Sequence, residues 1–178
     1  MAYDIVEKIS VFETGGWDNA QKGLYQIKHT LIHFWYKFVY PHMSGLYEMS
    51  TEEFYDRYIK EELNDYLNRY FVKVCGEYLA LLNAQGQLAV QAVKMGVWIG
   101  KKGTIDIIAQ DSVRQNIVAI CNWSEPELTD EIWKNLEFSM KQAKIKAEQY
   151  YLFSAQSFDE AIRERAEENP KIKLIDMN

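Results

Sequence analysis

Chemistry in this sequence centres on Asp106, an acidic side chain inside an otherwise apolar run. Residues 104–109 are rich in β-branched side chains, and a second such run, residues 117–123, follows after a polar turn. The pattern predicts the two strands of a hairpin, with one acid buried in the first strand. A carboxylate in such a place can ligate Mg²⁺. Lys101 and Lys102 directly precede the first strand, where they could face a phosphate group or form an ordinary solvated loop.

Metal-dependent cleavage of a phosphodiester needs more than one acid, and the second strand does not supply the other groups. Such a site holds the metal with several anionic oxygens and offsets the charge that develops on the phosphate. Alternation puts Ile120 and Asn122 on one face of their strand, and we expect both side chains close to Asp106. Ile120 cannot ligate a metal, and Asn122 offers only a neutral carbonyl oxygen. The sequence therefore favours a structural Asp106, hydrogen-bonded to backbone, over a metal ligand.

The composition predicts a compact cytoplasmic protein. The 178 residues are 48% apolar and 26% charged, which is typical of a globular domain. A net charge of −6 argues against strong nonspecific binding to nucleic acid. No apolar run approaches the roughly 20 residues that span a bilayer, and the first residues lack a signal-peptide pattern, so no membrane contact is expected. Cys75 and Cys121 are expected to be buried and reduced.

Hydrophobic periodicity and turn signals predict the elements that position these residues. Capping-box spacing marks helix starts at Ser50 with Glu53 and at Ser124 with Glu127. Two strand–helix–strand units after a hairpin imply right-handed crossovers, so we expect an α/β fold whose mixed sheet is flanked by helices. The expected helices cover residues 4–12, 30–40, 51–83 with a bend near 62–65, 124–147 and 157–168, breaks fall at 13–16 and 19–23, and the expected strands cover 24–28, 88–98, 104–109, 117–123, 150–153 and 171–176.

Several stretches, taken in order, resemble the C-terminal region of prokaryotic AAA+ ATPases that carry the domain of unknown function 234 (DUF234). The resemblance implies a restriction-endonuclease-like, PD-(D/E)XK fold over residues 46–178 and a short helical, winged-helix-like linker over residues 1–45. In that fold an Asp on one strand and a Glu-x-Lys on the next converge on a metal ion. The family's ATP-binding P-loop, Gly-x-x-x-x-Gly-Lys-Ser/Thr, does not occur in this sequence. The stretches are residues 22–28, 34–41, 70–71, 75–79, 103–109 and 151–154.

Three positions depart from the pattern of the family that the chain resembles. Val72 stands where the family often has Glu, and Ile120 and Asn122 stand where it has Glu-x-Lys. Asp106 is then the one acid left in its place. We therefore expect a catalytically degenerate module of a DUF234-type ATPase system, without a cofactor, that binds a protein or a nucleic acid.

The alternative is a weak metal-dependent DNA or RNA nuclease that uses Asp106, Glu77 and Lys102 with Mg²⁺. Glu77 lies beyond the lost helix acid and could face Asp106, although a lone helical glutamate usually faces solvent. His29 and His33 have the spacing of a metal clamp on one helix face. No carboxylate or cysteine is close to them in sequence, so ordinary helix histidines are expected.

The segment of residues 30–40 is dense in aromatic and aliphatic side chains. A helix that is apolar nearly all round must be covered on more than one side. Phe34, Trp35 and Phe38 are therefore expected to mediate self-association or binding of a protein partner, unless the core of this chain covers them.

Overall fold

The computed structural model describes residues 5–12 and 24–177, so the breaks expected at residues 13–16 and 19–23 lie outside the described residues. The helix expected over residues 4–12 is wrong. β1 (Val6–Ile9) instead pairs antiparallel with β2 (Leu24–Ile27), which confirms the second strand. Glu7 joins the pair further, because its carboxylate accepts a hydrogen bond from Gln26 Nε2 at 2.7 Å. A short segment gains too little from an isolated helix to outweigh such pairing.

A five-stranded mixed sheet forms the core of the molecule. The first three strands are antiparallel neighbours, and the last three run parallel. The two parallel connections each contain a helix, α5 (Asp130–Ala143) and then α6 (Glu160–Glu168), as the sequence predicts. The α/β class with a mixed sheet is therefore confirmed. In spatial order the strands are β3 (Lys94–Ile99), β4 (Thr104–Gln110), β5 (Asn116–Asn122), β7 (Gln149–Ser154) and β9 (Ile172–Asp176).

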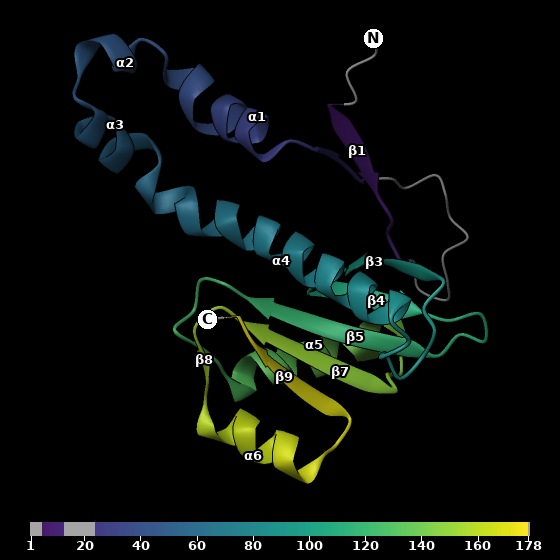
Figure 1. Ribbon diagram of the computed structural model, residues 1–178. Helices are drawn as coiled ribbons and strands as arrows, with labels where there is room; N and C mark the ends of the chain where they lie inside the picture. Colours follow the sequence, from purple (N-terminus) through teal and green to yellow (C-terminus); the bar gives the residue numbers. More distant parts are fainter. Residues whose placement is uncertain (1–4, 13–23, 178) are drawn as a thin grey trace.

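Helices cover both faces of this sheet. The long helix α4 (Lys60–Ala84) lies across one face, while α5 and α6 lie on the other (Figure 1). Because strand residues alternate between faces, the sheet has two separate apolar cores. The α4-side core includes Phe71, Cys75, Leu79, Ile107, Ala119, Cys121 and Phe153. The α5-side core includes Ile105, Ile108, Val118, Ile120, Trp133, Leu136, Met140, Leu152 and Ile162.

A helical arm, residues 30–70, extends beyond the sheet at the end where α4 begins (Figure 1). Its small core contains Phe38 and Tyr66, with the Tyr66 hydroxyl donating to Thr30 O at 2.7 Å. The helix expected over residues 30–40 is present, but only one of its sides is covered. The arm consists of α1 (Thr30–Phe34), a π-helical turn (Trp35–Val39), a 3₁₀ turn (Tyr40–His42), α2 (Gly45–Glu48), α3 (Thr51–Tyr58) and the first part of α4.

The predicted helix boundaries had mixed outcomes. The capping box of Ser50 and Glu53 is confirmed at the start of α3, and the break before α4 falls at Ile59 rather than at residues 62–65. The helix start expected at Ser124 is wrong, because β6 (Glu127–Leu128) pairs with β8 (Ser157–Phe158) and α5 begins after Thr129. β3 begins at residue 94 rather than 88. Within the described ranges, no helix has the length and apolar character of a membrane span.

Candidate functional site

Asp106 lies at an irregularity in β4. Between the pairs Gly96–Ile108 and Trp98–Ile105, β4 contains one residue more than β3, so Asp106 and its successor lie opposite a single residue. Such a β-bulge disturbs the alternation of side chains along the strand. Ile105 and Ile108 accordingly belong to the same core, on the α5 side, although they are three positions apart.

The side chain of Asp106 links β4 to β5. These strands are antiparallel, as predicted, and their regular pairing extends to Ile107 and Ala119. Beyond that pair, the backbone N–H of Cys121 donates to Asp106 Oδ2 at 2.9 Å. The carboxylate thus takes the place of a strand carbonyl, and this is the kind of backbone hydrogen bond that the sequence led us to expect.

The surroundings of Asp106 disfavour its charged form. Burial raises its pKa from 3.8 to about 6, and the hydrogen bond from the Cys121 amide offsets part of the rise. No Lys or Arg of the described ranges forms an ion pair with this carboxylate. The group is still mostly ionised at neutral pH, so the protein holds a poorly compensated charge at this position.

Two cavities border Asp106, one on each side of the bulge. The first has a volume of about 540 Å³, lies between α4, β1, β2 and β3, and is lined by Val72 as well as Asp106. The second has a volume of about 370 Å³, lies beside α5, and is lined by Lys102, Ile120 and Ser139 as well as Asp106. The structure therefore brings Asp106 together with Lys102 and Ile120 on one side, and with Val72 on the other.

Ile120 and Asn122 are both used by the fold. Ile120 is buried in the α5-side core. Asn122 Nδ2 donates to Glu125 O at 3.0 Å and to Ser154 Oγ at 3.4 Å, while Asn122 Oδ1 accepts from Glu125 N at 3.1 Å. Its amide closes the turn after β5 and lines neither cavity beside Asp106. Both side chains were expected close to Asp106. Ile120 shares a cavity with Asp106, and Asn122 does not.

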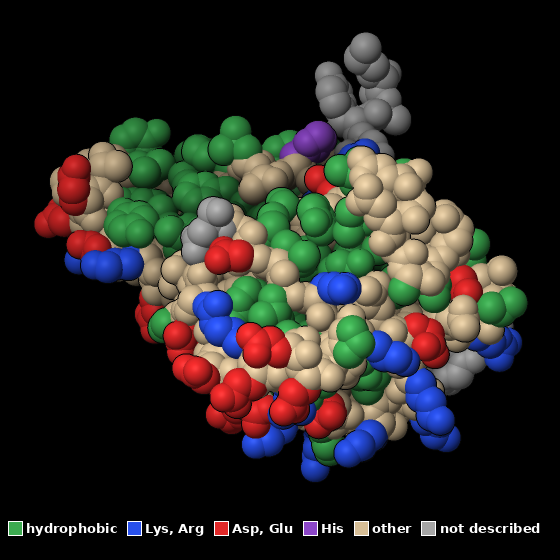
Figure 2. Space-filling model, turned by 60° about the horizontal axis from the view of Figure 1, so that its bottom comes forward, with side chains coloured by type: hydrophobic (Ala, Val, Ile, Leu, Met, Phe, Trp, Pro, Cys, Tyr) green, Lys and Arg blue, Asp and Glu red, His purple; other side chains and the backbone are tan. Residues whose placement is uncertain are grey.

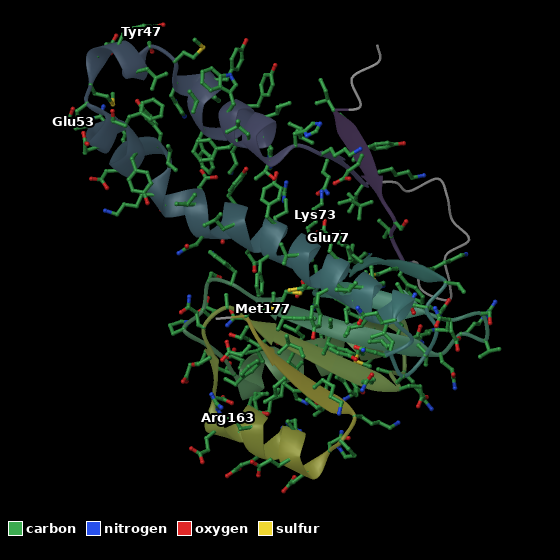
Figure 3. All side chains as sticks on the ribbon, in the orientation of Figure 1. Tyr47, Glu53, Lys73, Glu77, Arg163 and Met177 are labelled. Carbon is green, nitrogen blue, oxygen red and sulfur yellow. The ribbon has the colours of Figure 1, made fainter. Side chains whose placement is uncertain are left out.

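The remaining candidate ligands are dispersed. Glu77 is exposed on α4, one turn beyond Lys73, and lines neither cavity (Figure 3). Lys102 is exposed at the rim of the second cavity. His33 Nδ1 lies 2.9 Å from the hydroxyl oxygen of Tyr70, so this histidine belongs to the aromatic packing of the arm. In the described part of the chain, no three His, Cys, Asp or Glu side chains converge in a way that could hold a metal ion.

Two cysteines lie in the α4-side core near Asp106. Cys75 of α4 and Cys121 of β5 are both buried and reduced, in agreement with the sequence prediction. Burial raises the pKa of the Cys121 thiol, and a hydrogen bond with Cys75 and the nearby Asp106 carboxylate raise it further. Cys121 therefore stays protonated at neutral pH and acts as a small packing group rather than as a nucleophile.

Sequence reasoning missed the charged rim of the first cavity. Arg69 and Lys73 of α4 line this cavity together with Glu7 of β1, and Lys73 Nζ lies 3.5 Å from the Glu7 carboxylate. The i, i+4 spacing of the two basic residues could have shown that they share a helix face. The contribution of Glu7 depends on β1, which the sequence pattern predicts as a helix.

The chain matches one protein family and one relative whose descriptions name no activity. A model of the DUF234 family, described as archaeal and bacterial proteins of unknown function, matches residues 35–136. An uncharacterized protein of Methanocaldococcus jannaschii is 31% identical to the chain over 109 residues. That match covers 60% of this chain and 24% of the relative, so the chain spans about a quarter of the length of this relative. No solved structure matches the chain.

Proposed function

Because the chain belongs to the DUF234 family, we propose that it is a catalytically degenerate nuclease-like module that binds a protein or a nucleic acid instead of cleaving one. In this proposal the PD-(D/E)XK fold supplies the scaffold. Its support is the hairpin of β4 and β5, which carries Asp106 on one strand and Ile120 and Asn122 on the antiparallel neighbour. The helix position of Val72 borders the same cavity as Asp106.

One observation carries the degenerate assignment: the positions of the expected Glu-x-Lys are built into the fold. A metal ligand must present an accessible oxygen, and the Lys of such a site must present its charge to the substrate. Ile120 is buried in an apolar core, and the amide of Asn122 makes three hydrogen bonds that close a turn. Recovering the chemistry would require changes in packing as well as in side-chain type.

The link to an ATPase is also a proposal. The matched relative is about four times as long as the region that it shares with this chain, so it has room for further domains. In this proposal the chain consists of a linker over residues 1–45 and a nuclease-like domain over residues 46–178. Phe38 and Val39 pack against Phe54 and Tyr66 across residue 45, so the linker would be anchored on the domain.

A cleavage assay tests the absence of catalysis. The purified chain is incubated with labelled single- and double-stranded DNA and RNA in the presence of Mg²⁺ or Mn²⁺, with Asp106→Ala as the matched control. We expect intact substrates in every reaction. The melting temperature is measured with and without each metal, and we expect no shift, because an ion that binds the folded state would raise it.

The alternative, a weak nuclease that uses Asp106, Glu77 and Lys102, predicts the reverse. Cleavage by the unmodified chain that is abolished by Asp106→Ala and reduced by Glu77→Gln or Lys102→Ala would overturn the proposed function. Fluorescence anisotropy with the same labelled DNA and RNA, without cleavage, then separates nucleic-acid binding from protein binding.

A further inference from the structure

The arm leaves large apolar side chains exposed on its outer surface. Tyr47 is 84% exposed, Tyr40 58% and Trp35 43%, and the rings of Tyr36 and Tyr40 lie 5.4 Å apart. Figure 2 shows hydrophobic side chains gathered over this part of the molecule. We call this the aromatic surface, and it consists of Leu31, Trp35, Tyr36, Tyr40, Leu46 and Tyr47.

The exposure of these residues is not a consequence of a loosely packed arm. Phe38, in the same helical segment, is only 2% exposed, and it packs edge-on against Tyr66 at a ring distance of 5.4 Å. Lys37 is held by an ion pair with Glu62 of α4. The arm is therefore well packed around its own core, and its exposed aromatic residues are not part of that core. Tyr and Trp on such a surface are typical of protein interfaces.

Acidic side chains outnumber basic ones at the outer end of the arm. Residues 43–65 contain seven acidic and two basic side chains, which is a net charge of −5 out of −6 for the whole chain. Figure 3 shows Tyr47 and Glu53 at this end, on α2 and α3. Asp56 is paired with Lys60 at 2.8 Å. Four others make no ion pair in the described part of the chain: Glu48, Glu52, Glu61 and Asp65.

The aromatic and acidic groups together favour a basic protein over a nucleic acid as the partner. A phosphate backbone would be repelled by the negative field, because binding to nucleic acid depends on Lys and Arg that displace counterions. A basic protein surface would be attracted, and opposite charge at the rim of an interface speeds association and fixes its orientation. The aromatic groups need an apolar surface opposite them.

We propose that the aromatic surface of the arm docks a partner protein that presents an apolar patch bordered by Lys and Arg. This inference rests on the proposed function and deepens it, because it assigns the partner as a basic protein rather than a nucleic acid. The arm and Asp106 lie in separate parts of the chain, so binding at the arm and chemistry at Asp106 are tested separately.

Designed peptides provide the probe. A fluorescent 14-residue helical peptide of Leu and Lys, with its Leu residues on one face, is compared with a Leu–Glu peptide of the same pattern and with a scrambled Leu–Lys peptide. By anisotropy we expect the amphipathic Leu–Lys peptide to bind at least about tenfold more tightly than either of the others. Equal affinities for the amphipathic and scrambled Leu–Lys peptides would overturn the proposal, because the aromatic surface would then contribute nothing.

Matched variants locate the binding. The pair Tyr36→Ser and Tyr40→Ser is expected to weaken binding of the amphipathic Leu–Lys peptide at least about tenfold, while Phe138→Ser, an exposed aromatic residue on α5, leaves it unchanged. Neutralising Glu48, Glu52 and Glu61 to Gln is expected to weaken binding several-fold. Replacing Glu164, Glu167 and Glu168 of α6 by Gln removes the same number of charges elsewhere and is the control. If the arm and control variants lowered the affinity for the peptide equally, the proposal would be overturned.

Two further results would contradict this assignment. Sedimentation velocity showing a concentration-dependent dimer that Trp35→Asp abolishes would assign a second copy as the occupant. Tight binding of a single-stranded DNA that is lost in the Tyr36→Ser and Tyr40→Ser variant would assign nucleic acid. Cleavage of DNA or RNA by the chain would instead contradict the proposed function, and that outcome is visible in a different assay from the failure of the peptides to bind.

Discussion

The sheet around Asp106 and the helical arm use their side chains in opposite ways. In the sheet, polar groups at the candidate site are committed to the fold: Asp106 bonds the Cys121 amide, and Asn122 closes the turn at Glu125. In the arm, apolar groups such as Tyr36 are left in contact with solvent. In the first region, the polar side chains of the candidate site form structural hydrogen bonds. The second has apolar surface that its own core does not need.

The contrast shows why motif loss and surface composition have to be considered together. A missing Glu-x-Lys indicates only that cleavage is not expected, and it does not identify another role. The arm supplies that information, because burial of exposed Trp and Tyr is the main source of binding energy at protein interfaces. In this chain the region around Asp106 and the region with exposed aromatic side chains are different.

The strongest test of the contrast introduces charge into the sheet. Ile120→Glu is expected to lower the free energy of unfolding by about 3–5 kcal/mol, because it places a carboxylate among the apolar side chains of the α5-side core. Ile120→Val is the matched control, with an expected loss of about 1 kcal/mol. Urea unfolding followed by circular dichroism measures both.

The restored triple variant extends this test. A protein that carries Val72→Glu, Ile120→Glu and Asn122→Lys should be less stable than the native chain in buffer without metal. If it were as stable as the native chain and gained further stability from Mg²⁺, the site would still be built for charge, and the contrast with the arm would fail.

The arm itself contains a matched pair of residues. Phe38→Ala removes a buried ring and is expected to cost about 3–4 kcal/mol, whereas Tyr36→Ala, in the same turn, should change stability by less than about 0.5 kcal/mol. Both variants are compared by urea unfolding. Similar losses at the two positions would mean that Tyr36 supports the fold, and its role in docking would have to be abandoned.

The pH dependence of stability sharpens the description of Asp106. Its folded-state pKa of about 6 lies above the ordinary value of 3.8, so the folded protein holds the proton more tightly than the unfolded chain does. The free energy of unfolding therefore falls as the pH rises from about 4 to about 6. Above that range the buried carboxylate is ionised, and its full destabilising effect is present.

Asp106→Asn removes this cost while keeping an oxygen that can accept the hydrogen bond from Cys121. The stability advantage of the variant over the native chain should therefore grow by about 2 kcal/mol when the pH is raised from about 4.5 to about 8. Unfolding curves at both pH values, with Asp111→Asn in the exposed turn as the control, measure the difference. A gain that is the same at both pH values would show that the carboxylate does not titrate in this range.

The smallest expected effects compare helix caps in the two regions. Ser50 Oγ accepts from Glu53 N at 3.2 Å in the arm, and Ser50→Ala should cost about 1 kcal/mol. Asp159 accepts from Ile162 N at 2.8 Å and from Asp130 N at 3.0 Å, so it serves the starts of both α6 and α5. Asp159→Ala should cost about 2 kcal/mol, and a smaller loss than for Ser50→Ala would contradict this double role.

Local pattern determined much of the sheet and its crossovers. The strand β9 and the helices α5 and α6 were predicted because each depends on neighbours close in sequence, although α6 begins after Asp159 rather than at residue 157. The same holds for the capping box at Ser50. Side-chain period and capping chemistry are properties of short segments, so a single sequence contains them.

Tertiary structure alone decided the features that depend on distant partners. β1 exists because β2 is there to pair with it, and residues 127–128 extend because β8 lies beside them. The bulge that places Asp106 between two cavities arises from a mismatch of β4 with β3, which leaves no mark in either strand alone. Likewise, Phe38 and Tyr36 are both aromatic residues of one helical segment, and only the packing of the arm, which places Phe54 and Tyr66 in the same cluster as Phe38, makes one of them core and the other surface. Pairing and burial are relations between segments, and the order of residues within one segment does not specify them.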